Sequence, residues 1–225
     1  MRGITGVLFT AAWTASSALA PAAGGLGDLP GVDFDATGPG VRGLLMGLSE
    51  SCIMRRAFDG EIDLASLVNA GRTKWKVIDD NAALPDCGKR FASAIPEGLG
   101  DGRRLCQWSP AEGDRFEFET KDLLGRPAVR VTYQVTRITG GRYAGKGRFL
   151  TGVSVLPIRI EAKAGYKASM EAEVLAVNNV GTARDPVAAI VLAARWRVRG
   201  QGREHAGASV FLVRGDGLFS QLRGW

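Results

Sequence analysis

The sequence predicts an α+β protein, in which about seven or eight antiparallel strands form a strongly curved sheet or barrel capped by an N-terminal helix. The chain from residue 114 onward alternates apolar and polar residues in successive runs that short Gly- and Asn-containing turns separate. Such turns leave no room for helical crossovers, so the sheet should be antiparallel. Residues 41–58 instead repeat apolar side chains at helical spacing. Because a long one-sided sheet must close or be covered, this helix is its expected cap.

The N-terminus has the layout of a secretory signal peptide. Arg2 precedes an uncharged, mostly apolar stretch over residues 4–15, and A-x-A patterns follow up to Ala22. We therefore expect residues 1–22 to be removed and residues 23–40, rich in Gly, Pro and Asp, to form a linker. The mature protein should be periplasmic or secreted. No later apolar run reaches about 18 residues, so we expect no transmembrane segment in the mature chain.

Residues 41–113 are expected to be helical and loop-rich and to pack with residues 114–225 as one compact domain. A second short helical pattern covers residues 62–68, and the alternating "KWKVI" at 74–78 predicts a short strand. The apolar stripe of the first helix consists of Val41, Leu44, Leu45, Leu48, Cys52 and either Met54 or Phe58.

The β-rich part is divided by clear turn signals. Gly140-Gly141 predicts a two-residue hairpin turn, and "NNVGT" at 178–182, "QGREHAG" at 201–207 and "RGDG" at 214–217 predict further turns. The predicted apolar faces include Val129, Val131, Tyr133, Val135, Tyr143, Phe149, Ile158, Ile160, Tyr166, Met170, Val174, Ala208, Val210 and Leu212. Each strand should therefore have one covered face and one face in water.

Three cysteines, Cys52, Cys87 and Cys106, are present. In an oxidising compartment a pair of them should form a disulfide, and three pairings are open. Cys87 and Cys106 stand in loop-like sequence, which favours that pair because the backbone there can adjust. Cys52 lies in the predicted helix, where it is typical of a small buried hydrophobe.

A basic stripe within "ARWRVRG" has two interpretations. Arg195, Arg197 and Arg199 alternate with apolar residues, so they should share one face of a strand. They are either a solvated face that pairs with acids on neighbouring strands, or an anion-binding stripe. The expected acids are Glu161, Glu171 and Glu173, and the stripe could be extended by Arg142, Lys146 and Arg148.

The net charge of +6 is moderate and mixes acids with bases. Nucleic-acid-binding proteins usually concentrate their positive charge more strongly, so we expect no nucleic-acid partner. An exported basic protein more readily meets anionic lipid headgroups or wall polymers. The partner candidates are therefore a lipid and another envelope protein, with the oligomeric state left open.

The interior of the sheet should be lined by small residues. The inward set is Gly145, Gly147, Ala162, Ala168, Ala172, Ala176, Ala188, Ala194 and Ala208. Space beside Tyr143, Phe149, Met170 and Trp196 would suit an apolar ligand. The alternative is that the N-terminal helix fills this space. In both cases Trp196 should point inward, because it alternates with the arginines.

Catalytic and metal-binding patterns are weak. His205 is the only histidine and falls in a predicted turn, although every Ser-His-Asp or Cys-His arrangement would depend on it. No C-x-x-C or H-x-x-x-H spacing suggests zinc. "DFDATGPG" at 33–40 resembles half a calcium loop, but Leu44 occupies the position where that loop needs a glutamate. We therefore expect no enzymatic activity, cofactor or metal.

Two functional hypotheses follow. The first is an exported, non-catalytic cell-envelope protein whose curved sheet binds an apolar or amphipathic ligand such as a lipid. The second is a structural or assembly factor that binds another envelope protein, or an anionic envelope polymer, through a sheet edge or the arginine face. The sequence carries no motif set that identifies a known family.

Overall fold

The computed structural model describes residues 62–84, 90–100 and 102–224. These residues form eleven strands and one short 3-10 helix. The predicted signal peptide, linker and helix over residues 41–58 lie outside the described residues, as do Cys52 and Cys87. The short elements are β1 (Leu67–Asn69), β2 (Lys74–Asp79), β3 (Ala82–Ala83), β4 (Ala92–Pro96), η2 (Gly102–Arg104) and β11 (Phe219–Gly224). The long strands are β5 (Glu112–Lys121), β6 (Pro127–Tyr143), β7 (Lys146–Ala162), β8 (Tyr166–Asn179), β9 (Ala188–Gly200) and β10 (Arg203–Arg214).

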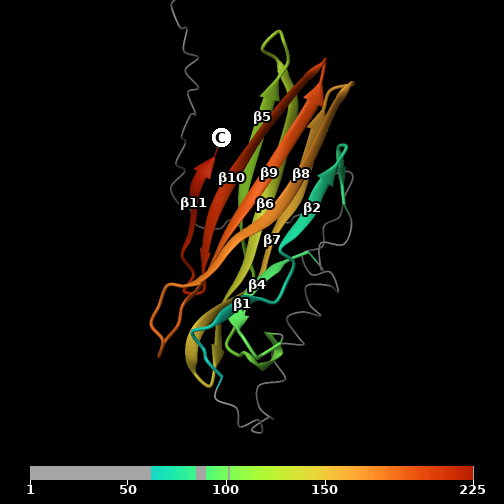
Figure 1. The fold of residues 1–225 in the computed structure, drawn as a ribbon. Helices are drawn as coiled ribbons and strands as arrows, with labels where there is room; N and C mark the ends of the chain where they lie inside the picture. The colour runs from blue at the N-terminus through green and yellow to red at the C-terminus, as the bar shows by residue number, and fades with distance from the viewer. Residues whose placement is uncertain (1–61, 85–89, 101, 225) are drawn as a thin grey trace, which may run out of the picture. The chain divides into compact units, whose positions relative to one another are not determined.

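The strands form two antiparallel sheets that face each other (Figure 1). The five-stranded sheet has the order β1-β4-β7-β6-β5, and the six-stranded sheet has the order β11-β10-β9-β8-β2-β3. The predicted antiparallel β-rich fold is confirmed, and seven strands, β5 to β11, make up its C-terminal part. The alternative of a closed barrel is wrong. Strands β5 and β11 are sheet edges, and they meet through side chains instead of backbone pairing, with the Phe116 and Phe219 rings 6.0 Å apart.

Aromatic side chains fill much of the space between the sheets. Phe116 of β5 lies 4.7 Å from Phe211 of β10, and Phe118 stacks on Trp196 of β9 at the same centroid distance. Tyr133 of β6 is almost fully buried. Burial raises the pKa of the Tyr133 phenol, which also has a hydrogen bond to the Ser209 side chain. Alternation predicts that Trp196 faces inward, and its contact with the opposite sheet confirms this.

The predicted apolar faces are wrong at Ile158 of β7, which is 47% exposed, and on β10. On β10 we expected Ala208, Val210 and Leu212 to face inward, but the inward side chains are Phe211 and Val213, which are fully buried. Both faces of this strand are apolar, so alternation alone could not orient it. The larger Phe211 fills the space opposite Phe116, which decides the orientation.

Two other local predictions are also corrected. The helical pattern over residues 62–68 ends in strand β1, which pairs with β4, and Leu64 packs against the core. Gly140-Gly141 is not the hairpin turn, because β6 continues to Tyr143 and the chain reverses at Ala144–Gly145. Gly141 is needed for packing, since a Cβ there would overlap the ring of Trp108.

His205 and Pro157 also lie in strands. The turn after β9 is limited to Gln201–Gly202, so His205 belongs to β10 opposite Val198 and is exposed. Pro157 lies inside β7, where the pairing with β6 shifts register. A proline can sit within a strand at such an irregularity because the missing N–H is then not needed by the ladder.

Candidate functional site

The four residues predicted to bind a ligand are not brought together. Tyr143 and Phe149 belong to the five-stranded sheet, whereas Met170 and Trp196 are paired neighbours in the six-stranded sheet. The residue before Phe149, Arg148, forms a bridge with Val187, just before β9 begins. Trp196 lies nine residues further along. At about 3.3 Å per residue, this places Phe149 and Trp196 roughly 30 Å apart, which is too far for one small ligand.

The small residues make room for neighbouring rings. A Cβ on Gly147 would overlap Phe149, and a Cβ on Gly200 would overlap Tyr166. Ala168, Ala172, Ala188 and Ala194 are buried, whereas Ala162 and Gly145 are exposed. Ala176 and Ala208 pair with outward residues and therefore lie on the outer face, although Ala208 is still buried there. The described part of the interior is therefore packed by protein side chains next to these small residues.

The arginines of the stripe are paired with acids on neighbouring strands. Arg195 pairs with Glu173 at 2.9 Å, and Arg197 and Arg199 share Glu204 at 3.1 and 2.9 Å. Lys74 of β2 continues the network through Glu171 at 2.9 Å, and this hydrogen-bonded carboxylate raises the pKa of Lys74. All four cations are more than half exposed. These pairs agree with the interpretation of the stripe as a solvated face. Two expectations differ from the structure, since Glu204 takes part where Glu161 was expected and the stripe is not extended by Arg142, Lys146 and Arg148.

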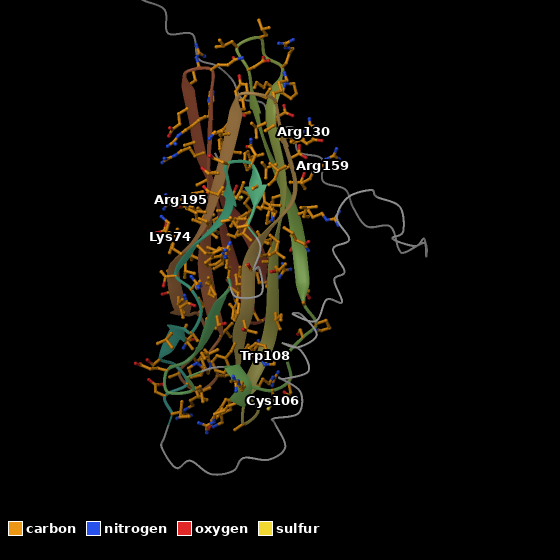
Figure 2. The ribbon with its side chains drawn as sticks, turned by 90° about the vertical axis from the view of Figure 1, so that its right-hand side faces the viewer. Lys74, Cys106, Trp108, Arg130, Arg159 and Arg195 are labelled. Atoms are coloured by element: carbon orange, nitrogen blue, oxygen red, sulfur yellow. The ribbon has the colours of Figure 1, made fainter. Side chains whose placement is uncertain are left out.

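Glu161 and the three cations expected to extend the stripe lie in the five-stranded sheet. Glu161 belongs to β7 in the other sheet and pairs with Arg159. Nearby, Arg130 pairs with Glu117 and Glu119, and the bond to Glu119 is the main reason that the pKa of Arg130 is raised. Figure 2 shows Arg130 and Arg159 on one side of the molecule and Arg195 and Lys74 on the other. Arg142, Lys146 and Arg148 also belong to β6 and β7, so they do not extend the stripe.

Arg137 is a buried cation that the sequence did not single out. It lies on β6, and its guanidinium donates to Glu112 and Asp114 on β5. The same group lies over the Phe219 ring of β11, 4.4 Å from its centroid. Arg137 therefore links the edges of both sheets through an ion-pair and cation–π contact. Alternation could have suggested it, because Arg137 continues the inward series Val131, Tyr133 and Val135.

Cys106 lies at the lower end of the view in Figure 2, beside Trp108. Its backbone N–H donates to the Arg142 carbonyl at 2.9 Å, which joins the loop after η2 to β6. Cys106 is disulfide-bonded. Cys52 and Cys87 lie outside the described residues, so the pairing of Cys87 with Cys106 stays a prediction.

Chemical sites are not evident among the described residues. Within them, no group of three or more His, Cys, Asp or Glu side chains is placed to hold a metal ion. The same part of the chain contains no helix with the length and apolar character of a membrane span. One hollow between β2 and β7 is lined by Trp75, Lys76, Val77, Leu84, Arg90, Ser154, Val155 and Pro157.

Comparisons with known proteins do not assign the chain to a family. No protein-family model matches the sequence, and no curated protein or solved structure matches it. The surfaces and edges of the two sheets therefore carry the evidence about function.

Proposed function

We propose that this protein is an exported, non-catalytic structural or assembly factor of the cell envelope, which binds another envelope protein through the free edge of β11. Its export rests on the predicted signal peptide. The proposal is carried by one observation, the difference between β11 and the other three sheet edges. Among the described residues, β11 pairs only with β10.

The other three edges have the features that usually prevent unwanted strand pairing. β1 and β3 span only three and two residues. β5 is long, but it carries charged side chains along its length, including Arg115, Glu117 and Glu119. Short strands and charged edges are the common protections against edge-to-edge association. β11 has six residues, of which Arg223 alone is charged.

The outer face next to β11 is apolar and would suit a partner strand. Val210 and Leu212 of β10 and Val191 of β9 alternate with buried inward residues, so they lie on the outer face and are only partly covered. Leu222 is 54% exposed. A strand added to β11 would gain main-chain hydrogen bonds from the edge and apolar contacts from this face.

The interior gives less support to the lipid hypothesis. The four candidate lipid-contacting residues are split between two ends of the fold, and Phe118 occupies the face of Trp196. An exported protein with such packing acts more readily through its surface. Native mass spectrometry of protein from its own compartment keeps the two hypotheses distinguishable, because a retained lipid of defined mass would favour the interior site.

Site-specific photo-crosslinking tests the β11 proposal. We expect a photoreactive residue at position 222 to capture one defined envelope protein, and the same residue at position 123 to capture none. Leu123 is the matched control, since it is 59% exposed but lies in the turn after β5. Leu222→Lys should abolish capture from a neighbouring probe at Ser220, whereas Leu123→Lys should not. A crosslink from position 222 to residues 23–61 of the same chain would show that the edge is covered internally and would refute the proposal.

A further inference from the structure

We infer that the end of the β6–β7 hairpin is a second binding surface, whose partner is an anionic phospholipid membrane. Three segments meet there: the hairpin turn, the loop around η2 and the loop between β8 and β9. Besides Arg103 of η2, they carry five further cations, Arg104, Arg142, Lys146, Arg148 and Arg184, which we call the cationic tip. This inference is independent of the β11 proposal.

Hydrogen bonds hold the three segments together. The Arg142 and Cys106 backbones exchange two hydrogen bonds, of 2.7 and 2.9 Å, which fix the η2 loop to β6. The Arg148 N–H donates to the Pro186 carbonyl at 2.9 Å, which fixes the β8–β9 loop to β7. The hairpin itself reverses through Ala144 and Gly145, both with positive φ, as a tight two-residue turn requires. Backbone hydrogen bonds therefore hold the segments that carry these cations next to one another.

The cationic tip differs from the arginine stripe in its lack of acidic partners among the described residues. None of its five cations forms an ion pair with a described residue, although the stripe and both outer faces are full of such pairs. Two described acids lie in this region: Asp185 accepts a hydrogen bond from the Gly147 N–H at 3.0 Å, and Asp216, in the turn next to Arg148, pairs with Arg214 at 2.6 Å. A backbone hydrogen bond leaves the charge of Asp185 in place, but the five cations of the tip outnumber these two described acids.

Tyr143 gives the tip an aromatic component. Arg104 donates to the Tyr143 hydroxyl at 3.2 Å, and its guanidinium lies 5.6 Å from the ring centroid. Arg104, Lys146 and Arg184 are exposed, and Tyr143 is half-buried. Guanidinium groups bind phosphate oxygens well, and an amphipathic ring suits the headgroup layer of a membrane.

A membrane surface fits the geometry better than a single phosphate. The cations come from three separate segments around a protruding turn, so they can reach several headgroups at once. Each Lys or Arg near an anionic membrane contributes about 1 kcal/mol of attraction, and the attraction falls within a Debye length. Such a surface should therefore bind vesicles with an affinity that depends on lipid charge and on salt.

Vesicle flotation with the full-length exported protein tests this inference. Wild-type protein should bind vesicles that contain phosphatidylglycerol and should not bind pure phosphatidylcholine vesicles. The triple variant Arg104→Gln, Lys146→Gln and Arg184→Gln should lose roughly 100-fold in affinity at low salt, since three cations are removed. The matched control Arg195→Gln, Arg197→Gln and Arg199→Gln removes the same charge from paired positions and should lose less than about threefold.

Several outcomes would overturn the inference. Wild-type protein that fails to bind anionic vesicles contradicts it, and so does an equal loss in the two triple variants, which would indicate net charge alone. Full competition by millimolar inorganic phosphate would indicate a site for a free phosphate. Should the tip triple variant unfold, Lys146→Gln with Arg184→Gln provides a milder test, with an expected loss of roughly 30-fold. Loss of vesicle binding with intact crosslinking at position 222 separates this inference from the β11 proposal.

Discussion

The arginine stripe and the cationic tip contain similar residues and differ in their surroundings. The stripe places Arg195, Arg197 and Arg199 within 3.1 Å of Glu173 or Glu204. The tip collects five cations that have no acidic partner among the described residues. The stripe is the more conspicuous of the two in the sequence, yet the tip retains the charge needed to attract an anion. A run of arginines therefore says little about binding until the positions of the acids are known.

The reason is the register of neighbouring strands. Glu173 lies on β8 and Glu204 on β10, so both acids reach the stripe only through pairing with β9. At the tip, the neighbouring segments are loops that contribute Arg104 and Arg184. Exposed pairs add roughly 0–1 kcal/mol of stability each, so pairing in the stripe changes its electrostatic field more than the stability of the fold.

The largest effect on stability is expected at Arg137, which is buried, whereas the arginine stripe and the cationic tip lie at the surface. Arg137→Met should keep much of the packing but remove the contacts with Glu112, Asp114 and the Phe219 ring. We expect a loss of about 2 kcal/mol in the free energy of unfolding, below the cost of breaking a fully buried pair because both acids are half exposed. Urea unfolding would measure it. A loss no greater than that of Arg195→Met would contradict a linking role for Arg137.

Removing the acids of the arginine stripe should give it the affinity for anionic membranes that we infer for the cationic tip. Glu173→Gln with Glu204→Gln leaves Arg195, Arg197 and Arg199 without their carboxylate partners. Affinity for phosphatidylglycerol vesicles should then rise by roughly tenfold, while the free energy of unfolding changes little. In 0.5 M salt the affinity of this variant should fall to about that of the wild-type protein, because exposed charges are screened. No gain at low salt would show that position, and not pairing, distinguishes the two regions.

The smallest expected effect is on the pH dependence of stability, through Asp122, a carboxylate that pairs with Arg126 and Lys163. Asp122 accepts hydrogen bonds from the Arg126 and Leu124 N–H groups and from Lys163. The Arg126 N–H is the main cause that lowers the pKa of Asp122 to about 2. A lowered folded-state pKa means that the ionised group stabilises the fold above the unfolded pKa near 3.8, and that this contribution is lost as the pH falls through about 2.

Thermal unfolding of Asp122→Asn tests this pH dependence. The variant should melt below wild type at pH 7, and the gap should narrow between pH 4 and pH 2. Lys163→Gln is the control, because it removes one of the contacts to Asp122 and leaves the backbone donors in place. A gap that stays constant down to pH 2 would mean that the Asp122 charge does not stabilise the turn.

The sequence by itself determined the local pattern of this protein. Alternation predicted the antiparallel strands from β5 to β11, the inward position of Trp196 and the shared outer face of the three arginines. These properties depend on residues one or two positions apart, and the geometry of a strand translates such spacing directly into faces.

Only the tertiary structure decided which surfaces meet. Phe211, and not Leu212, faces inward because Phe116 of the other sheet lies opposite it, and Gly141 serves Trp108 and not a turn. The sheets do not close because β5 and β11 meet through rings and not through backbone pairing. The arginines of the stripe are paired because two other strands bring glutamates to them. Most of these contacts join residues tens of positions apart, and only Glu204, five positions from Arg199, is close in the sequence. Strand order and register set the approach of the distant residues, which no local window of the chain encodes.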